Sequence, residues 1–388
     1  KSSINKEILQ LKWNHHKTMQ KEDFKMIIDE LILQMIKDVN KLSEEKNSNR
    51  YIKKHPIEKV FLLLLLQQYS GIDNGRGFSL YIKRMIGDTT ETISQSELSK
   101  KLCYRLPVEL FHDMFKLQLS RLQGKKSKGI RKIKKLIRII DSTALPATAT
   151  MDYAKHRRNK NGFKLHTVIG EEYIPENVKL KNGNSSDKKS LKWAVKEGFI
   201  HIFDRGYNDY SQFQWIEEKQ AFFVTRALGN IKYSIVQNRK VGHRQKEKGI
   251  ISDRIIEVIA DRKQNITYSM RMVTFRFIDS SGKEQTFSLL TNLMNYRSDE
   301  IAELYRKRWN IEVVFRWIKM FLKIERWLSR SKNGVLIQIY IALCAYIIVL
   351  TAKMNDLKKY RIMKDAIYDF IIKLKASIRM FERGSNIE

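Results

Sequence analysis

The sequence predicts an α/β protein whose core is interrupted by a β-rich insertion and flanked by helical regions. Residues 1–125 carry apolar side chains at helical spacing, most clearly in a stripe along 21–42. From Leu136 onward, short apolar runs alternate with helical segments, which indicates a mixed sheet covered by helices. The segment 226–290 then alternates as strands do, and helical patterns return from about Arg297.

The chain of 388 residues is long enough for two or three domains. We expect a helical N-terminal region (1–125), the first part of an α/β core (126–225), the β-rich insertion (226–290), the rest of the core (291–352) and a C-terminal helical region (353–388).

Individual elements follow from the same patterns. Core strands are expected at 136–140, 163–169, 177–180, 200–203 and 221–224. Helices between them are expected at 191–197 and 210–219. The insertion is expected to hold strands at 254–260, 266–277 and 285–290, with a turn at 280–282.

The charge balance indicates a polyanionic partner. Lys and Arg number 74 against 42 Asp and Glu, a formal charge of +32. The basic residues are spread through apolar segments, whereas a ribosomal protein, the plainer alternative, usually carries them in tails. Neutralising phosphates releases counterions and drives binding, so we expect nucleic acid as the partner.

Cysteine usage and apolar runs favour a cytoplasmic, nucleoid-associated protein. Cys103 and Cys344 are too isolated for a disulfide framework or a metal cluster, and are expected to be buried and reduced. The run 335–352 is long enough to span a bilayer but contains Gln338 and sits in a highly charged chain. We therefore expect a buried helix and no membrane partner.

Two features of the N-terminal region are candidates for DNA contact. The segments 78–85 and 94–104 are expected to be short helices joined by a polar turn, which fits a helix-turn-helix as well as a small bundle with a solvated face. The segment 124–138 has eight Lys or Arg among fifteen residues, which fits a solvated hinge or a linker that tracks phosphates. We expect the region 1–125 to bind DNA.

Two acidic residues follow apolar strands. Asp141 comes after the run 136–140, and Asp204 comes after 200–203. Each alone is explained equally well as a cap for the next segment. Two strands of one sheet that both end in Asp bring their carboxylates to one crevice, where like charges need a cation between them. The pair therefore favours a metal site.

A third acid, Glu312, is expected on a helix that begins near Ser298. Tyr305, Arg308 and Lys319 share its face, because all four positions fall within roughly 60° of arc. The alternative is an ordinary amphipathic helix with an Arg308–Glu312 ion pair. We expect this polar strip to be embedded in apolar surroundings, formed by Trp309, Val313, Phe315, Trp317 and Ile318.

The spacing of Tyr305, Arg308, Glu312 and Lys319 is similar to the YREK signature of transposases of the insertion-sequence-4 family. DSTAL at 141–145, GFKLH at 162–166, DRGY at 204–207 and FVTR at 223–226 also resemble blocks of that family. The resemblance covers roughly 136–352, and the N-terminal third only in general character. It implies an RNase H-like core with a β-rich insertion between the second Asp and the Glu.

The resemblance also implies roles for individual residues. In a DDE transposase of this kind, Asp141, Asp204 and Glu312 would be the catalytic acids and the metal ligands. The implied DNA contacts are Tyr305, Arg308, Lys319, Arg205, Lys164 and His166.

One departure concerns base flipping. Described members of the family stack a Trp of the insertion on a flipped base, but residues 225–300 contain no Trp. Tyr268, Phe275 and Phe277 are the aromatic candidates for this contact, because any aromatic face can stack on a base. Whether a hairpin intermediate forms is therefore left open.

Carboxylate and phosphate oxygens favour hard cations, so we expect two Mg²⁺ ions, for which Mn²⁺ could substitute. The expected reaction is cleavage at the ends of the element, followed by attack of the freed 3′-OH on target DNA. Both substrates are double-stranded DNA, and the resemblance implies a homodimer that pairs two ends.

Three other classes stay open at this point. A tyrosine recombinase would need further Arg and His residues around Tyr305. A catalytically inactive or domesticated copy would bind DNA without cutting it. Another RNase H-like nuclease would cut DNA without joining strands.

Overall fold

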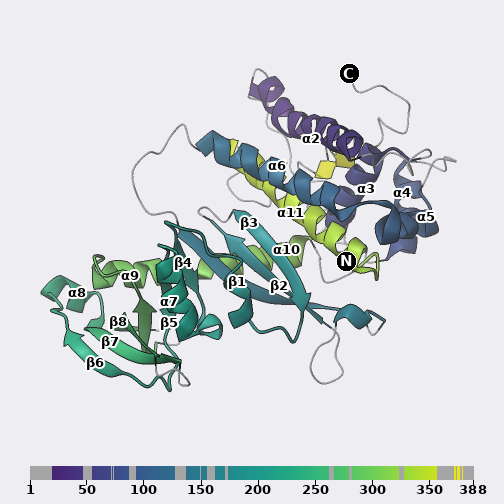
Figure 1. Cartoon of the computed structure of the whole chain (residues 1–388). Helices are drawn as coiled ribbons and strands as arrows, with labels where there is room; N and C mark the ends of the chain where they lie inside the picture. Colours follow the sequence, from purple (N-terminus) through teal and green to yellow (C-terminus); the bar gives the residue numbers. More distant parts are fainter. Residues whose placement is uncertain are drawn as a thin grey trace.

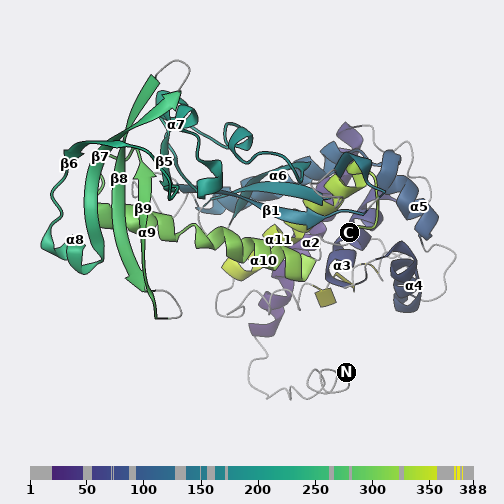
Figure 2. The same ribbon diagram turned by 90° about the horizontal axis from the view of Figure 1, so that it is seen from below.

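The computed structural model shows a mixed α/β protein built on one large sheet. Figures 1 and 2 show the N-terminal helices gathered at one end of the molecule and the strands of the insertion at the other. Most of the expected basic linker and most of the expected C-terminal region lie outside the described residues. The structure describes 20–46, 55–70, 72, 74–86, 93–126, 137–148, 150–154, 162–170, 174–261, 266–278, 282–322, 327–355 and the single residues 371, 372, 374, 375 and 378.

The N-terminal region is helical, as its apolar spacing predicts. Its elements are α2 (Gln20–Glu45), α3 (Ile57–Ser70), α4 (Gly75–Ile86), α5 (Gln95–Lys100), a π-helical turn (Lys101–Arg105) and α6 (Val108–Lys126). The two short helices expected at 78–85 and 94–104 correspond to α4 and to α5 with the π-helical turn. Ser94 caps α5 by accepting a hydrogen bond from the N–H of Glu97 at 3.1 Å.

The apolar run near the C-terminus forms a core helix, α11 (Lys332–Asn355). Its segment Lys332–Met354 is long and apolar enough to cross a membrane, but 89% of the apolar window is buried inside the protein. The helix packs along α6 and also contacts α3 (Figure 1). This confirms the expectation of a buried helix, and it joins the N-terminal helices to the rest of the protein through one hydrophobic core.

The core strands have the order β3-β2-β1-β4-β5. They are β1 (Ile137–Pro146), β2 (Gly162–Ile169), β3 (Pro175–Asn182), β4 (Ile200–Phe203) and β5 (Phe222–Arg226). The pairs β1–β2 and β2–β3 are antiparallel, whereas β1–β4 and β4–β5 are parallel. All five strands were expected from the apolar runs. The parallel pair β1–β4 is the one that positions the acidic residues.

The insertion continues the core sheet rather than forming a separate one. Its strands are β6 (Ser234–Asn238), β7 (Ile250–Asp261), β8 (Ile266–Ile278) and β9 (Glu284–Thr291), with the short helix α8 (His243–Glu247) after β6. Because β9 pairs with β5, the sheet extends to nine strands and ends at β6. The sequence pattern missed β6, since all five of its residues are exposed and no apolar alternation marks it.

One expected helix is wrong. Residues 191–197 form turns that follow a short 3₁₀ helix (Lys188–Ser190), whereas α7 (Tyr210–Glu218) lies where a helix was expected. The N–H of Lys196 donates to Nε2 of His201 at 3.1 Å, and Gly198 adopts a φ of 77°. Both features turn the chain directly into β4 and leave no room for helical hydrogen bonds.

The helix expected from Ser298 is divided in two. α9 (Ser298–Arg306) ends in a turn at Lys307 and Arg308, and α10 (Trp309–Leu322) follows it. At this turn the N–H of Arg308 donates to the carbonyl of Tyr305 and that of Ile311 to Arg308, at 3.0 and 3.1 Å. These bonds span three residues rather than four, which tightens the chain locally.

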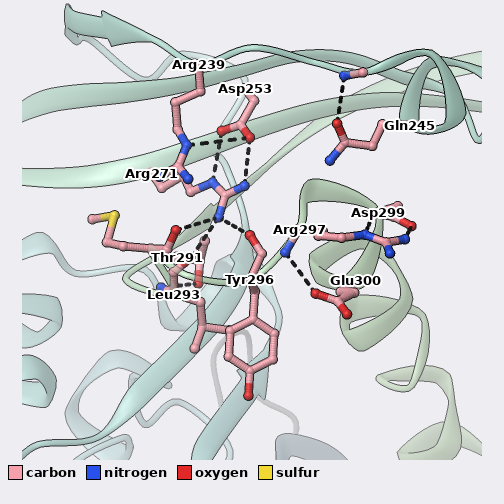
Figure 3. Close-up of polar contacts among 12 residues, drawn as sticks. Arg239, Gln245, Asp253, Arg271, Thr291, Leu293, Tyr296, Arg297, Asp299 and Glu300 are labelled. Atoms are coloured by element: carbon pink, nitrogen blue, oxygen red, sulfur yellow. Dashed lines mark hydrogen bonds and ion pairs between the residues drawn. The ribbon is translucent and has the colours of Figure 1, made fainter.

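A buried arginine fixes the insertion to the chain that enters α9 (Figure 3). Arg271 of β8 is 1% exposed and donates to both carboxylate oxygens of Asp253 on β7, at 2.9 and 2.6 Å. Its third nitrogen donates to the carbonyls of Leu293 and Tyr296 at 2.8 and 2.6 Å. The insertion is therefore bonded directly to the segment that leads to Tyr305, Arg308 and Glu312.

Candidate active site

Asp141 and Asp204 are neighbours because of the register between β1 and β4. The last parallel pair in that ladder is Ile140 with Phe203, so the next residue on each strand is an aspartate. Parallel neighbours in register lie about 4.8 Å apart and point to the same face. The sequence led us to expect Asp141 at the end of its strand, but β1 continues to Pro146 along β2. What ends just before Asp141 is the pairing of β1 with β4.

Neither Asp141 nor Asp204 caps the segment that follows it, which was the alternative explanation for an aspartate at each position. Asp204 precedes a 3₁₀ helix (Arg205–Tyr207) but makes no side-chain capping hydrogen bond. Its Oδ1 instead lies 3.5 Å from the hydroxyl of Tyr305, which donates to it. Asp141 lies within β1, where its Oδ1 accepts the N–H of Ser142 at 2.7 Å.

Glu312 reaches the same place because α10 packs against β1. Four apolar residues at helical spacing are buried on that side of α10: Ile311, Val314, Phe315 and Ile318. Glu312 lies at the edge of this buried stripe and is 35% exposed. Its Oε1 accepts a hydrogen bond from Arg308 at 2.8 Å, and another nitrogen of Arg308 donates to Oδ2 of Asp141 at 3.3 Å.

Arg308 and Tyr305 thus link all three acids. Arg308 joins Asp141 to Glu312, although Asp141 and Arg308 are 167 positions apart in the chain. Tyr305, on α9, touches Asp204. Tyr305, Arg308 and Glu312 therefore lie with the two aspartates at one end of the β1–β4 ladder.

Burial determines the electrostatics of this cluster. It raises the pKa of Asp141 to about 6, because the N–H of Ser142 and the charge of Arg308 offset burial only in part and Asp204 and Glu312 add repulsion. Burial likewise raises the pKa of Tyr305 to about 12, so its hydroxyl remains a donor at neutral pH. For Arg308, burial is the largest single cause and lowers the pKa, but the hydrogen bond with Glu312 and the charges of Tyr305, Asp141 and Glu312 together outweigh it, so the pKa is raised.

The donor set fits a hard divalent cation. Asp141, Asp204 and Glu312 offer only carboxylate oxygens, and a buried excess of negative charge favours a cation. Among the described residues, no three His, Cys, Asp or Glu side chains converge closely enough to form a ready metal site. Arg308 lies between two of the three acids and already supplies positive charge there.

The other expected DNA contacts fall into two groups. Arg205 is exposed, and Lys319 lies on α10 seven residues beyond Glu312 and is half-buried. Lys164 on β2 is instead engaged by Asp187, whose Oδ2 accepts from its ammonium at 3.1 Å. His166 is fully buried, which argues against the expected DNA contact.

The environment of His166 explains its burial. Its Nδ1 lies 3.2 Å from the hydroxyl of Tyr207, and its Nε2 lies 3.2 Å from the hydroxyl of Ser190. Burial lowers the pKa of His166 to about 4, so the ring is neutral at physiological pH. Sequence reasoning assigned His166 to DNA from its motif, because a lone histidine on an alternating strand gives no sign of which face is buried.

Of the three aromatic candidates for base stacking, two are buried and one is exposed. Tyr268 and Phe275 are 7% and 2% exposed, which argues against either as a base-stacking residue, whereas Phe277 is 36% exposed. Trp309 is 60% exposed at the start of α10, where the guanidinium of Arg308 lies 5.2 Å from its ring centroid. The expectation that Trp309 and Val313 embed the polar strip is therefore wrong: α10 buries its other side.

Comparison with known proteins places this chain in the class of enzymes that cut and transfer DNA strands. The transposase DDE domain family matches residues 132–348, more than half of the chain. The chain therefore belongs to the family of DDE-domain transposases. Enzymes of this family act on DNA and generally use divalent metal ions.

Individual relatives carry the same designation. The chain is 30% identical over 255 residues to transposase y4zB of Sinorhizobium fredii, which covers 65% of this chain and 70% of that protein. It is 23% identical to a transposase for insertion sequence element IS5377 of Geobacillus stearothermophilus, over 87% of this chain and 85% of that protein. A transposase for element IS4SA of a Synechocystis strain is 27% identical over 68% and 72% of the two chains.

Proposed function

We propose that this transposase cleaves the ends of its insertion sequence and joins the freed 3′-OH to target DNA, with Asp141, Asp204 and Glu312 as the catalytic acids. The observation that carries the proposal is the β1–β4 register, which ends at Ile140 and Phe203 and sets the two aspartates side by side. Glu312 joins them through Arg308.

The proposed site would hold Mg²⁺, with Mn²⁺ as a substitute, on these three carboxylates. When bound, two such ions supply activation of the attacking oxygen and stabilisation of the leaving one. Arg308 presents a planar guanidinium suited to a phosphate. Lys319 and Arg205 add positive charge, and Tyr305 donates a hydrogen bond. Trp309 offers an exposed ring on which a base near the cut can stack.

Finer assignments extend this proposal. The strand order β3-β2-β1-β4-β5, with two antiparallel and two parallel pairs, supports an RNase H-like core. The Tyr305–Lys319 spacing and the name of the Synechocystis relative support membership of the insertion-sequence-4 family. We also propose that the N-terminal helices bind double-stranded DNA, that the enzyme pairs two ends as a homodimer, and that it acts on the nucleoid in the cytoplasm.

The acids are tested by isosteric variants assayed on DNA that carries both ends of the element. Asp204→Asn and Glu312→Gln should each reduce Mg²⁺-dependent cleavage by at least roughly a thousandfold, because each removes a charge needed in the transition state. Affinity for the ends, measured by mobility shift, should change little. Matched controls are Asp209→Asn, in the loop before α7, where it accepts from the side chains of Ser211 and Gln212, and Glu303→Gln, which is exposed on α9.

Each result has a defined meaning. Cleavage by Asp204→Asn at the normal rate would remove Asp204 from the catalytic acids. Wild-type protein that binds the ends without cutting them would be a DNA-binding protein only. Cleavage without a strand-transfer product would indicate a nuclease.

A further inference from the structure

A fourth carboxylate, Asp187, lies close to Asp141 and contacts Ser142, the next residue in the chain. It follows β3 in a polar turn and directly precedes the 3₁₀ helix Lys188–Ser190. An aspartate at this position commonly caps the helix, but Asp187 makes no side-chain capping hydrogen bond. Its side chain is 25% exposed and is turned toward β1 and β2 instead.

Asp187 is hydrogen-bonded to Ser142, the residue whose backbone is hydrogen-bonded to the Asp141 carboxylate. The hydroxyl of Ser142 donates to Oδ1 of Asp187 at 3.0 Å, while the backbone N–H of the same serine donates to Oδ1 of Asp141 at 2.7 Å. The side chain of Ser142 is thus fixed from one direction while its backbone fixes the Asp141 carboxylate from the other. Removing Asp187 would leave the Ser142 hydroxyl without this acceptor, and would remove one contact that ties β1 beside Asp141 to the turn at Asp187.

Asp187 also lies close to the segment that carries Asp204. The 3₁₀ helices Lys188–Ser190 and Arg205–Tyr207 are neighbours, and a Cβ atom added to Gly206 would lie 3.8 Å from Oδ2 of Asp187. The adjacent Tyr207 is buried, and after burial the charges of Asp141 and Asp187 are the largest causes that raise its pKa. The same carboxylate therefore lies against both acidic segments, although they are far apart in sequence.

The charge of Asp187 is balanced by Lys164, and the neutral ring of His166 lies beside it. Lys164 donates to Oδ2 of Asp187 at 3.1 Å and to the carbonyl of Ser185 at 3.1 Å. His166, the next residue on the same face of β2, has Nδ1 3.8 Å from Oδ1 of Asp187. A carboxylate held in this way has a fixed orientation, as a group that orients another ligand requires.

We propose that Asp187 is a positioning residue that, through Ser142, orients the Asp141 carboxylate for divalent-metal binding beside Asp204. This rests on the proposed function, in which Asp141 and Asp204 hold the metal. Groups that orient metal ligands typically change metal affinity or activity by about 10–100-fold when removed. The proposed chemistry gives no role to Lys164 or Ser142. The positioning role explains both, because each is hydrogen-bonded to Asp187.

The test uses the full-length protein with Asp187→Ala, Asp187→Asn, Ser142→Ala and the double alanine variant. Binding of Mn²⁺ to the DNA-free protein is measured by calorimetry, and cleavage is titrated with Mg²⁺. Asp187→Ala should weaken Mn²⁺ binding and raise the half-saturating Mg²⁺ concentration by about tenfold. Asp187→Asn keeps an oxygen that accepts from Ser142, so it should recover part of the loss. The double alanine variant should lose no more Mn²⁺ affinity than whichever single alanine variant binds Mn²⁺ less tightly.

Controls separate this role from stability and from the proposed function. Asp209→Asn removes a loop carboxylate that accepts a hydroxyl, that of Ser211 at 2.7 Å, and should leave Mn²⁺ binding unchanged. Wild-type Mn²⁺ affinity in folded Asp187→Asn and Asp187→Ala, or additive losses in the double variant, would overturn the positioning role. If Asp204→Asn also bound Mn²⁺ normally and cut DNA, the proposed function itself would fail.

Discussion

Two arginines of this transposase, Arg271 and Arg308, pair with carboxylates, and the two clusters differ in their exposure to solvent. Arg271 is 1% exposed and bonds to both oxygens of Asp253, which is 4% exposed, and to backbone carbonyls of the loop before α9. Arg308 is 12% exposed, and its partners Asp141 and Glu312 are 19% and 35% exposed. The first cluster is closed to solvent, whereas the second opens to it.

The difference shows what each cluster can do. Every nitrogen of Arg271 has a partner, so the pair is complete without a ligand. The Nε of Arg308 is buried and has no hydrogen-bond partner in the described part of the protein, and Asp141 is only partly compensated. A structural ion pair satisfies its own groups, whereas a site that must bind DNA and a cation leaves some of them unsatisfied.

The largest effect on stability should come from breaking the closed cluster. Arg271→Met removes both charge-assisted hydrogen bonds of the buried Asp253 and leaves it only Arg239, at 3.9 Å, which should lower the free energy of unfolding by roughly 3–5 kcal/mol in urea denaturation. Arg276→Met on the same strand is the matched control. Its side chain is 56% exposed and lies 3.9 Å from Glu284, so its removal should cost less than about 1 kcal/mol. Equal losses in the two variants would contradict the contrast.

The open cluster should respond to pH in the opposite sense to an ordinary ion pair. The pKa of Asp141 is raised from 3.8 to about 6, so the folded protein keeps a proton that the unfolded chain has released. The resulting stability is fully present below pH 3.8 and is lost as the pH rises through about 6. In chelator, Asp141→Asn should therefore be more stable than wild type at pH 7.5, by at most about 3 kcal/mol, and equal to it near pH 3.5.

Metal addition sharpens this test. Saturating Mg²⁺ should stabilise the wild type at pH 7.5 and so reduce the advantage of Asp141→Asn, because the cation replaces the missing counter-charge. The two proteins are compared by thermal unfolding at each pH, so that the titration of other carboxylates cancels. An Asp141→Asn variant less stable than wild type at pH 7.5 in chelator would show that Asp141 is stabilising, contrary to the direction of its pKa.

Sequence reasoning could single out the three candidate acids because their signals are local. An apolar run followed by Asp marks Asp141 and Asp204, and fixed helical spacing marks Glu312 and Arg308. It did not show that β1 continues past Asp141, because pairing with β2 decides where that strand ends. Such pairing is a long-range property that no local pattern encodes.

Residues whose role depends on orientation were missed for the same reason. Asp187 sits in the polar turn 182–187, which resembles an ordinary surface loop until its contact with Ser142 is known. Trp309 was expected to be embedded, because helical periodicity does not reveal which side of α10 meets β1. The available clue was that position 309 falls outside the i, i+3, i+4, i+7 spacing of the residues that are buried, Ile311, Val314, Phe315 and Ile318.

The smallest expected change in stability distinguishes the two arginines most directly. Arg308→Met should lower the free energy of unfolding by less than Arg271→Met does, because Glu312 is 35% exposed and the mostly buried Asp141 can take up a proton instead of staying charged. Its effect should appear instead in DNA binding: the slope of log affinity against log salt should fall by about one, as for the loss of one phosphate contact. Arg306→Met, exposed on α9, removes the same charge and should leave the slope nearly unchanged. A fall of equal size in both variants would mean that net charge, and not the position of Arg308 beside Asp141, governs the interaction with DNA.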